Sequence, residues 1–154
     1  MIDTLVSMPE SESQSRRLIW ALRRAFLAVE AEKESRLRHT GVSPAHYAVL
    51  INVQVAEGLT AAELARRLHL TPQNVGGLVT KLVGAGWLER RLHPQHRHVW
   101  ELYLTDAGAE ALREAEAVVH DVELSILDTL ADDEIEPFRA ALESVAAIAR
   151  SGTP

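Results

Sequence analysis

Apolar residues recur every three or four positions through most of this chain, and this spacing predicts a mainly helical protein. Near the start, Ile19, Leu22, Phe26 and Val29 lie at helical spacing, with arginine and glutamate between them. They predict a long amphipathic helix over residues 14–38. We expect the polar stretch before this helix to be disordered.

The second helix is predicted from its start and stop signals. The helical pattern stops at residues 39–42, and Ser43 followed by Pro44 is typical of a helix start. The serine hydroxyl can cap free backbone N–H groups, and proline fits the first helical turn. Gly58 is expected to end this helix, because glycine is favoured just after the last helical residue.

Two short helices joined by three residues follow. Thr60 and Glu63 have the spacing of a capping box at the start of a helix over residues 61–68. Thr71 and Pro72 repeat the cap-plus-proline signal for a helix that ends near residues 84–86. Because only residues 69–71 connect them, the pair predicts a helix-turn-helix.

Two short runs suited to β-strands come next, at residues 87–92 and 99–104. Residues 93–98, which include three histidines and an arginine, lie between the runs, so we predict a β-hairpin with a basic tip. Residues 105–108 cap another long helix, and Asp132 begins a last one. The predicted fold is a single mostly α domain over residues 1–154 with a small β-hairpin wing, in the order α-α-α-α-β-β-α-α.

The amino-acid composition excludes several kinds of functional site. At 154 residues and 47% hydrophobic content the chain can bury the core of one domain. It contains no cysteine, which excludes disulfides, thiolate metal sites and thiol redox sensing. The apolar runs fall short of the roughly 18 residues that a membrane span needs. We therefore expect a cytoplasmic protein that does not engage a membrane.

Charge is distributed unevenly along the chain. The net charge is −6, which by itself argues against binding to a polyanion. Residues 60–104, however, carry six Lys/Arg against three Asp/Glu and hold four of the seven histidines. Residues 105–154 carry three Lys/Arg against twelve Asp/Glu. The helix-turn-helix and hairpin are thus the part of the chain suited to face DNA.

The second helix of the predicted helix-turn-helix has the chemistry of a recognition helix. Its apolar stripe leaves short polar side chains on the outer face, where they can reach base edges in the major groove. Gln73 and Asn74 can pair with adenine, and Lys81 with guanine or phosphate. Gly76 and Gly77 interrupt this helix, either to allow close approach of DNA or because packing tolerates them.

Taken together, these segments resemble the MarR (multiple antibiotic resistance regulator) family over roughly residues 14–150. The resemblance is carried by TAAELARRL at 60–68, LTPQNV at 70–75, LVTKL at 78–82, GWLERR at 86–91 and LTDAG at 104–108. It implies a homodimer held by residues 14–38 and 106–151, and a winged-helix DNA-binding lobe over residues 43–104. It also implies a repressor that binds a pseudo-palindromic operator in double-stranded DNA and is released by a small-molecule effector bound between the dimer helices and the lobe.

The residue roles follow from the chemistry of the recognition helix and from the resemblance. The family's wing-tip arginine matches Arg97, but histidines replace the acidic residues that commonly accompany it. The expected dimer contacts are Ile19, Leu22, Phe26, Phe138, Leu142 and Val145. The expected DNA contacts are Thr71, Gln73, Asn74, Gly77, Thr80, Lys81, Arg90, Arg91, His96, Arg97 and His98.

Other functions have less support in the sequence. No catalytic residues or cofactor are expected, since no phosphate loop or nucleophile elbow is present. No metal is expected, because successive side chains at a hairpin tip point to opposite faces and the tip contains no carboxylate. A zinc-responsive regulator of the same fold, and a helical interaction protein that does not bind DNA, remain alternatives. Zinc ligands would come from Glu30, Glu32, Glu34, His39, His46 and His120, or from the wing histidines His93, His96 and His98. An aromatic effector pocket would draw on Trp20, Trp100 and Tyr103.

Overall fold

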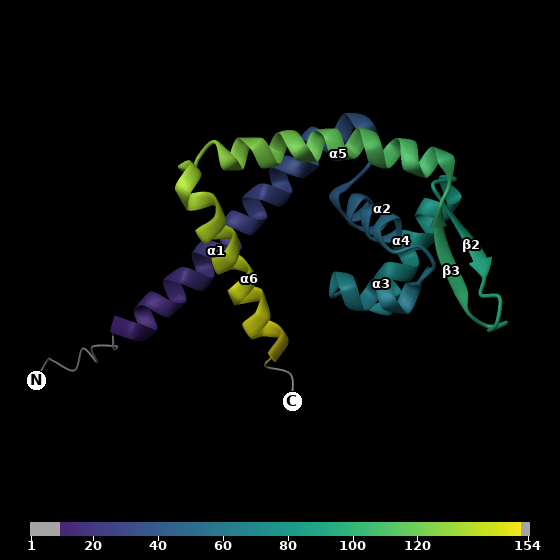
Figure 1. Ribbon diagram of the computed structural model, residues 1–154, viewed down its shortest axis with the longest axis horizontal. Helices are drawn as coiled ribbons and strands as arrows, with labels where there is room; N and C mark the ends of the chain where they lie inside the picture. Colours follow the sequence, from purple (N-terminus) through teal and green to yellow (C-terminus); the bar gives the residue numbers. More distant parts are fainter. Residues whose placement is uncertain (1–9, 152–154) are drawn as a thin grey trace, which may run out of the picture.

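The computed structural model describes residues 10–151. One long helix, α5, runs along an edge of the molecule and joins a lobe at one end to two further helices at the other (Figure 1). The lobe contains α2, α3, α4 and the sheet, and the far end contains α6 and the first part of α1. The last residue of α1, Leu37, reaches the core of the lobe. The elements are α1 (Glu10–Leu37), a 3-10 helix η1 (Arg38–Thr40), α2 (Pro44–Val55), β1 (Leu59–Thr60), α3 (Ala61–Leu68), α4 (Pro72–Gly84), β2 (Leu88–Leu92), β3 (Trp100–Leu104), α5 (Asp106–Leu127) and α6 (Asp132–Ser151).

Four helices begin at the caps that the sequence predicts. The Ser43 hydroxyl accepts a hydrogen bond from the His46 N–H at 3.2 Å at the start of α2. Thr60 and Glu63 form both halves of the capping box that opens α3. Thr71 caps α4 and Thr105 caps α5, in each case by accepting from the N–H three residues later. The four predicted helix starts are confirmed. They could be predicted from sequence because a cap involves only residues that are close together in the chain.

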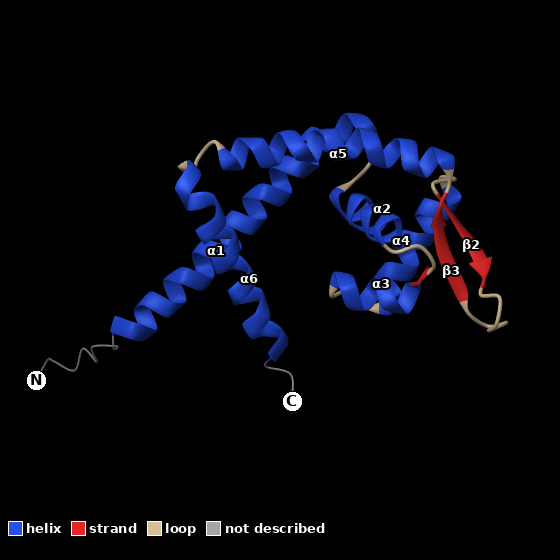
Figure 2. Cartoon of the chain, viewed as in Figure 1, coloured by secondary structure: helices blue, strands red, loops and turns tan. Residues whose placement is uncertain are grey.

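The sheet has one strand more than predicted. The sequence predicts a two-stranded hairpin, whereas the structure has three antiparallel strands in the order β1-β3-β2 (Figure 2). β1 is only two residues long and pairs Leu59 with Leu102 of β3. Such a short strand has no alternation that a sequence pattern could reveal. The hairpin strands also begin one residue later than predicted, at Leu88 and Trp100.

The helix boundaries differ from prediction at two places. α1 begins at Glu10 and not at residue 14, so the expected disordered start is wrong for residues 10–13, and residues 1–9 lie outside the described part of the chain. α2 ends at Val55, before Gly58. Gly58 has a φ of +78° and takes the chain from α2 toward β1, a backbone conformation that favours glycine.

The core of the lobe is built from aliphatic side chains of every surrounding element. Leu64 of α3, Leu82 of α4, Leu88 of β2 and Leu102 of β3 are each at most 2% exposed. Leu112 of α5 packs into the same core. Burying one such side chain contributes about 1.5–3 kcal/mol, so this cluster holds the helix-turn-helix against the wing.

The first turn of α5 is attached closely to the start of the hairpin. A Cβ added at Gly108 would lie 1.9 Å from the carbonyl oxygen of Trp87. Thr105 donates its N–H to that same oxygen at 3.2 Å and its hydroxyl to the Gly86 carbonyl at 2.6 Å. These contacts set the angle between α5 and the wing, and therefore between α5 and the rest of the lobe.

Candidate nucleic-acid interface

The predicted recognition helix α4 buries one face and presents the other to solvent. Val75, Val79 and Leu82 are at most 1% exposed and pack into the lobe core. The opposite face carries the polar side chains that the sequence assigns to DNA, and all of them are exposed. They are Thr71, Gln73, Asn74, Thr80 and Lys81, with Gly77 among them.

Gly76 and Gly77, in the middle of α4, are not required by packing inside the chain. A Cβ added at Gly76 or Gly77 would meet no atom within 4 Å, and neither residue has a positive φ. Glycine in a helix interior costs about 1 kcal/mol relative to alanine. Since packing within the chain does not require these glycines, the space next to them on the surface of α4 is open to a binding partner.

A positive charge on α4 faces the start of α2. Burial, and then the nearby Lys81 ammonium, lower the pKa of His46 below its ordinary value of 6.5. The Nδ1 atom of His46 is buried and has no hydrogen-bond partner among the described residues. Burial and the Lys81 ammonium both favour the neutral imidazole of His46. Lys81 therefore supplies the positive charge at this end of the helix.

The two arginines of β2 point to opposite faces of the wing. The register pairs Arg90 with Leu102 and Arg91 with Glu101, and neighbouring residues of a strand alternate between faces. Arg91 forms an ion pair with Glu89 and lies over the Tyr103 ring at 4.3 Å. Arg90 lies on the side of α4, with its Nη2 3.5 Å from the Thr80 hydroxyl. Of the two predicted DNA contacts, the structure therefore brings only Arg90 to the recognition helix.

The wing tip is a closed turn with exposed basic residues. The His93 N–H bonds to the Val99 carbonyl at 2.9 Å, and the His93 Nδ1 accepts from the Gln95 N–H at 3.1 Å. Glu101 of β3 lies 3.6 Å from the Nε2 of His93. A carboxylate therefore reaches the base of the tip, but it contacts His93 and not Arg97. His96, Arg97 and His98 are exposed beyond it.

Trp100 lies at this surface, although nothing in the sequence predicted it as a DNA contact. The structure puts it, half exposed, in a groove of about 210 Å³ between α4 and the wing, together with Gly76 and Arg90. Trp100 is two residues from the buried Leu102 and so lies on the same face of the strand, and this spacing is the signal that could have placed it on the α4 side.

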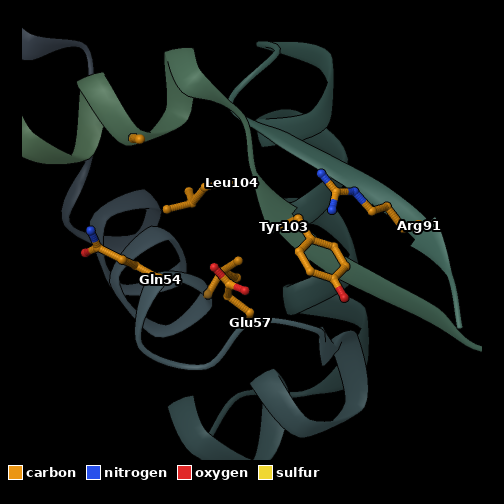
Figure 3. Close-up of a pocket in the computed structure, with 7 residues that line it drawn as sticks. Gln54, Glu57, Arg91, Tyr103 and Leu104 are labelled. Carbon is orange, nitrogen blue, oxygen red and sulfur yellow. The ribbon is translucent and has the colours of Figure 1, made fainter.

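The aromatic residues proposed for an effector pocket are not brought together. Trp20 lies on α1 and Trp100 lines the groove beside α4. Tyr103 lines a separate pocket of about 310 Å³ between the lobe and the first turns of α5, which Glu57 and Arg91 also line (Figure 3). Its hydroxyl donates to Glu101 at 2.8 Å, and this hydrogen bond is the main cause that raises its pKa.

The residues considered for zinc do not form a cluster either. Within residues 10–151, no three His, Asp or Glu side chains are placed to hold one ion. Glu30 pairs with Lys33 and Glu32 pairs with Arg36 along α1. The structure therefore offers the zinc-responsive alternative no preformed site in this part of the chain.

The predicted dimer contacts lie on α6 and on the part of α1 that precedes the lobe core. Ile19 and Phe26 on α1 are 65% and 64% exposed, and Leu22 is half-buried. Phe138, Leu142 and Val145 on α6 are all exposed. No helix in the described range is long and apolar enough to cross a bilayer.

Known proteins resemble this chain in sequence. A model of the MarR family matches residues 40–97. The HTH-type transcriptional repressor Rv2887 of Mycobacterium tuberculosis is 27% identical over 126 residues, which cover 82% of this chain and 91% of the relative. The same identity and coverage hold for the repressor Mb2911 of Mycobacterium bovis.

Solved structures agree with the fold over nearly the whole chain. The transcriptional repressor CouR bound to a 23-mer DNA duplex has a TM-score of 0.81 at 26% identity, covering 93% of this chain and 99% of that chain. A MarR-family regulator from Rhodococcus sp. RHA1 has a TM-score of 0.77 at 26% identity, covering 86% of this chain and 94% of that chain. The capped recognition helix, the adjoining wing and these relatives agree: the chain is similar to the winged helix-turn-helix transcriptional regulators of the MarR family.

Proposed function

We propose that this protein is a transcriptional repressor that binds double-stranded DNA as a homodimer in the cytoplasm. Residues 43–104 form the DNA-binding lobe, and residues 14–38 and 106–151 form the dimer. In each subunit α4 enters the major groove, and the wing tip with Arg97 reaches the flanking minor groove. The chain is a regulator and not an enzyme.

One observation carries this proposal. The exposed face of α4 presents Gln73, Asn74 and Lys81 beside the side of the wing that carries Arg90, in a chain whose net charge is −6. Amide side chains next to cations match the chemistry of base edges flanked by phosphates. In a chain with net negative charge, such a locally basic surface is suited to face a polyanion. The repressor CouR, solved on a DNA duplex, supports the same arrangement here.

The dimer is supported by the apolar faces of α1 and α6. Large hydrophobic side chains such as Ile19, Phe26 and Phe138 are exposed on helices that a single chain leaves uncovered. Contiguous apolar surface on a small protein typically marks an interface. A second copy would cover both helices at once through a two-fold axis, and this symmetry explains why a pseudo-palindromic operator is expected.

A small-molecule effector is the proposed release signal. CouR from Rhodococcus jostii RHA1 has been solved bound to p-coumaroyl-CoA, with a TM-score of 0.76 at 26% identity over 86% of this chain. Here the pocket lined by Glu57, Arg91 and Tyr103 lies between the lobe and α5, so a ligand could change the angle between them. We expect a small aromatic or anionic ligand to release operator DNA.

Selection of duplexes from a random library by the purified protein tests the DNA-binding proposal. We expect a pseudo-palindrome whose half-sites lie about one helical turn apart, and affinity that falls steeply with salt. The double substitution Gln73→Ala/Asn74→Ala should remove sequence preference but leave weak binding to random duplex. Arg113→Ala/Glu114→Ala, on the exposed surface of α5, is the matched control and should bind normally. Recovery of an unsymmetrical single site would contradict the dimeric mode.

A further inference from the structure

A groove between the recognition helix and the wing is lined by residues of four elements, α3, α4, β2 and β3. Ala61 begins α3, Gly76 lies midway along α4, and Arg90, Trp100 and Leu102 belong to the wing. We call this the helix–wing groove. Its floor is mainly apolar, and Trp100 at its rim is 51% exposed although it is the largest side chain there. An exposed tryptophan beside open space is typical of a binding surface.

The apolar surface continues from Trp100 toward the wing tip. Leu92 is the cross-strand partner of Trp100 in the register of the hairpin, and it is also half exposed. The wing tip and α3 both lie on the side of the lobe away from α5 (Figure 1). The groove therefore lies on the face that also carries the recognition helix and the exposed tip.

The charge at the groove comes from an arginine that has no carboxylate partner. Among residues 10–151, Arg90 forms no ion pair, and its guanidinium contacts only the Thr80 hydroxyl at 3.5 Å. The adjacent Arg91 is neutralised on the opposite face by Glu89. A free cation next to an apolar floor matches the two parts of a nucleotide backbone unit, which are a phosphate and a sugar with a C–H face.

We propose that the helix–wing groove seats one deoxyribose of the DNA backbone, with Trp100 packed against the sugar and Arg90 paired with the adjoining phosphate. This inference rests on the proposed function. A helix in the major groove and a wing in the minor groove must lie on either side of one sugar-phosphate strand, because that strand separates the two grooves. The helix–wing groove is the space between those two elements, so the strand has to pass it.

Gly76 fits the same assignment. It lines the helix–wing groove, and a Cβ there would touch no protein atom. A methyl group would therefore take space only from the occupant of the groove. Gly76→Ala should raise the thermal midpoint by a few degrees, about 2–4 °C, through helix propensity, and yet weaken DNA binding. A purely structural glycine would not move these two quantities in opposite directions.

The test compares Trp100→Ala, Arg90→Ala and Arg113→Ala on a selected operator and on a random duplex, by fluorescence anisotropy over a range of salt concentrations. A sugar contact carries no sequence information, so Trp100→Ala should weaken both duplexes by about five- to tenfold with an unchanged salt slope. Arg90→Ala should also weaken both, and it should reduce the slope of log affinity against log salt by about 0.9. Arg113→Ala, on α5, should match the wild type.

A second measurement keeps the inference open to refutation if Trp100→Ala fails to fold. In a Trp20→Phe/Trp87→Phe background, Trp100 is the remaining tryptophan, and its emission should shift to shorter wavelength when random duplex is added. Wild-type affinity in Trp100→Ala, loss confined to the selected operator, or unshifted emission would each overturn the inference while the proposed function stands. Wild-type protein that binds neither duplex would overturn the proposed function and this inference with it.

Discussion

The lobe and the terminal helices use the same spacing of apolar residues but reach opposite outcomes. In the lobe, Val75, Val79 and Leu82 of α4 are almost fully buried by the chain itself. On α6, Phe138, Leu142 and Val145 follow a similar spacing and are all exposed. The lobe supplies helices and a sheet on several sides of α4, whereas α6 begins at the far end of α5 and stands apart from the lobe (Figure 1). An amphipathic stripe therefore indicates that a face is to be covered, but not by which chain.

The largest expected effect comes from breaking the proposed dimer. Phe138→Glu/Leu142→Glu places charge on the exposed stripe of α6 and should give a monomer with a folded lobe. Operator affinity should fall about 100-fold or more, because two linked recognition helices gain affinity from effective concentration. Light scattering and anisotropy check both points. Ser144→Glu, on the other side of α6, is the control, and a dimer that survives the double substitution would contradict the prediction.

Next in size is a cavity in the lobe core. Leu64→Ala should lower the free energy of unfolding by about 2–5 kcal/mol, because a fully buried leucine is removed. Ile19→Ala truncates a side chain that is 65% exposed in the single chain. Urea unfolding of both, in the monomeric Phe138→Glu/Leu142→Glu background, should show the loss only for Leu64→Ala. Equal losses would mean that α1 is covered within one chain.

A smaller effect is expected where α5 joins the lobe. Gly108→Ala forces a Cβ against the backbone of Trp87 and should destabilise the protein by about 1–3 kcal/mol. Gly84→Ala, where a Cβ meets nothing within 4 Å, should be neutral or stabilising by up to about 1 kcal/mol. Thermal unfolding distinguishes the two. A stabilised Gly108→Ala variant would show that α5 is not attached to the hairpin as described.

The smallest expected effect is a pH dependence of lobe stability. Burial and Lys81 lower the pKa of His46 in the folded chain, so the unfolded chain binds the proton more readily. Stability present above pH 6.5 should be lost as the pH falls from 6.5 through the lower folded pKa. His46→Gln should flatten this slope in urea titrations, and Lys81→Met should flatten it by less. An unchanged slope in His46→Gln would rule out this source.

Local chemistry made much of the fold predictable. The caps at Ser43, Thr60, Thr71 and Thr105 were correct because each involves a hydroxyl and a backbone N–H three residues away. The polar set on α4 was equally readable, since 3.6-residue periodicity alone separates Gln73 and Asn74 from the buried stripe. Strand β1 was missed because its two residues are a strand only through pairing with β3.

The arginines and Trp100 show where local reasoning stops. Arg90 and Arg91 are chemically identical neighbours in the sequence. Only Arg91, however, forms an ion pair with Glu89 and stacks over the Tyr103 ring. Which of two such residues is free depends on the register of β2 and β3 and on which face α4 covers. The sequence suggested Trp100 only as part of an effector pocket, whereas in the structure it lies half exposed in the groove between α4 and the wing.

The sequence by itself determined the helix-turn-helix, the caps, the basic wing and the resemblance to the MarR family, because these depend on residue types at short separations. Only the tertiary structure decided which arginine of the wing is free, where Trp100 and Gly76 meet, and that the apolar faces of α1 and α6 lack a cover within one chain. The physical reason is that burial and ion pairing are properties of surfaces assembled from distant segments. No periodicity within one segment can specify what lies opposite to it.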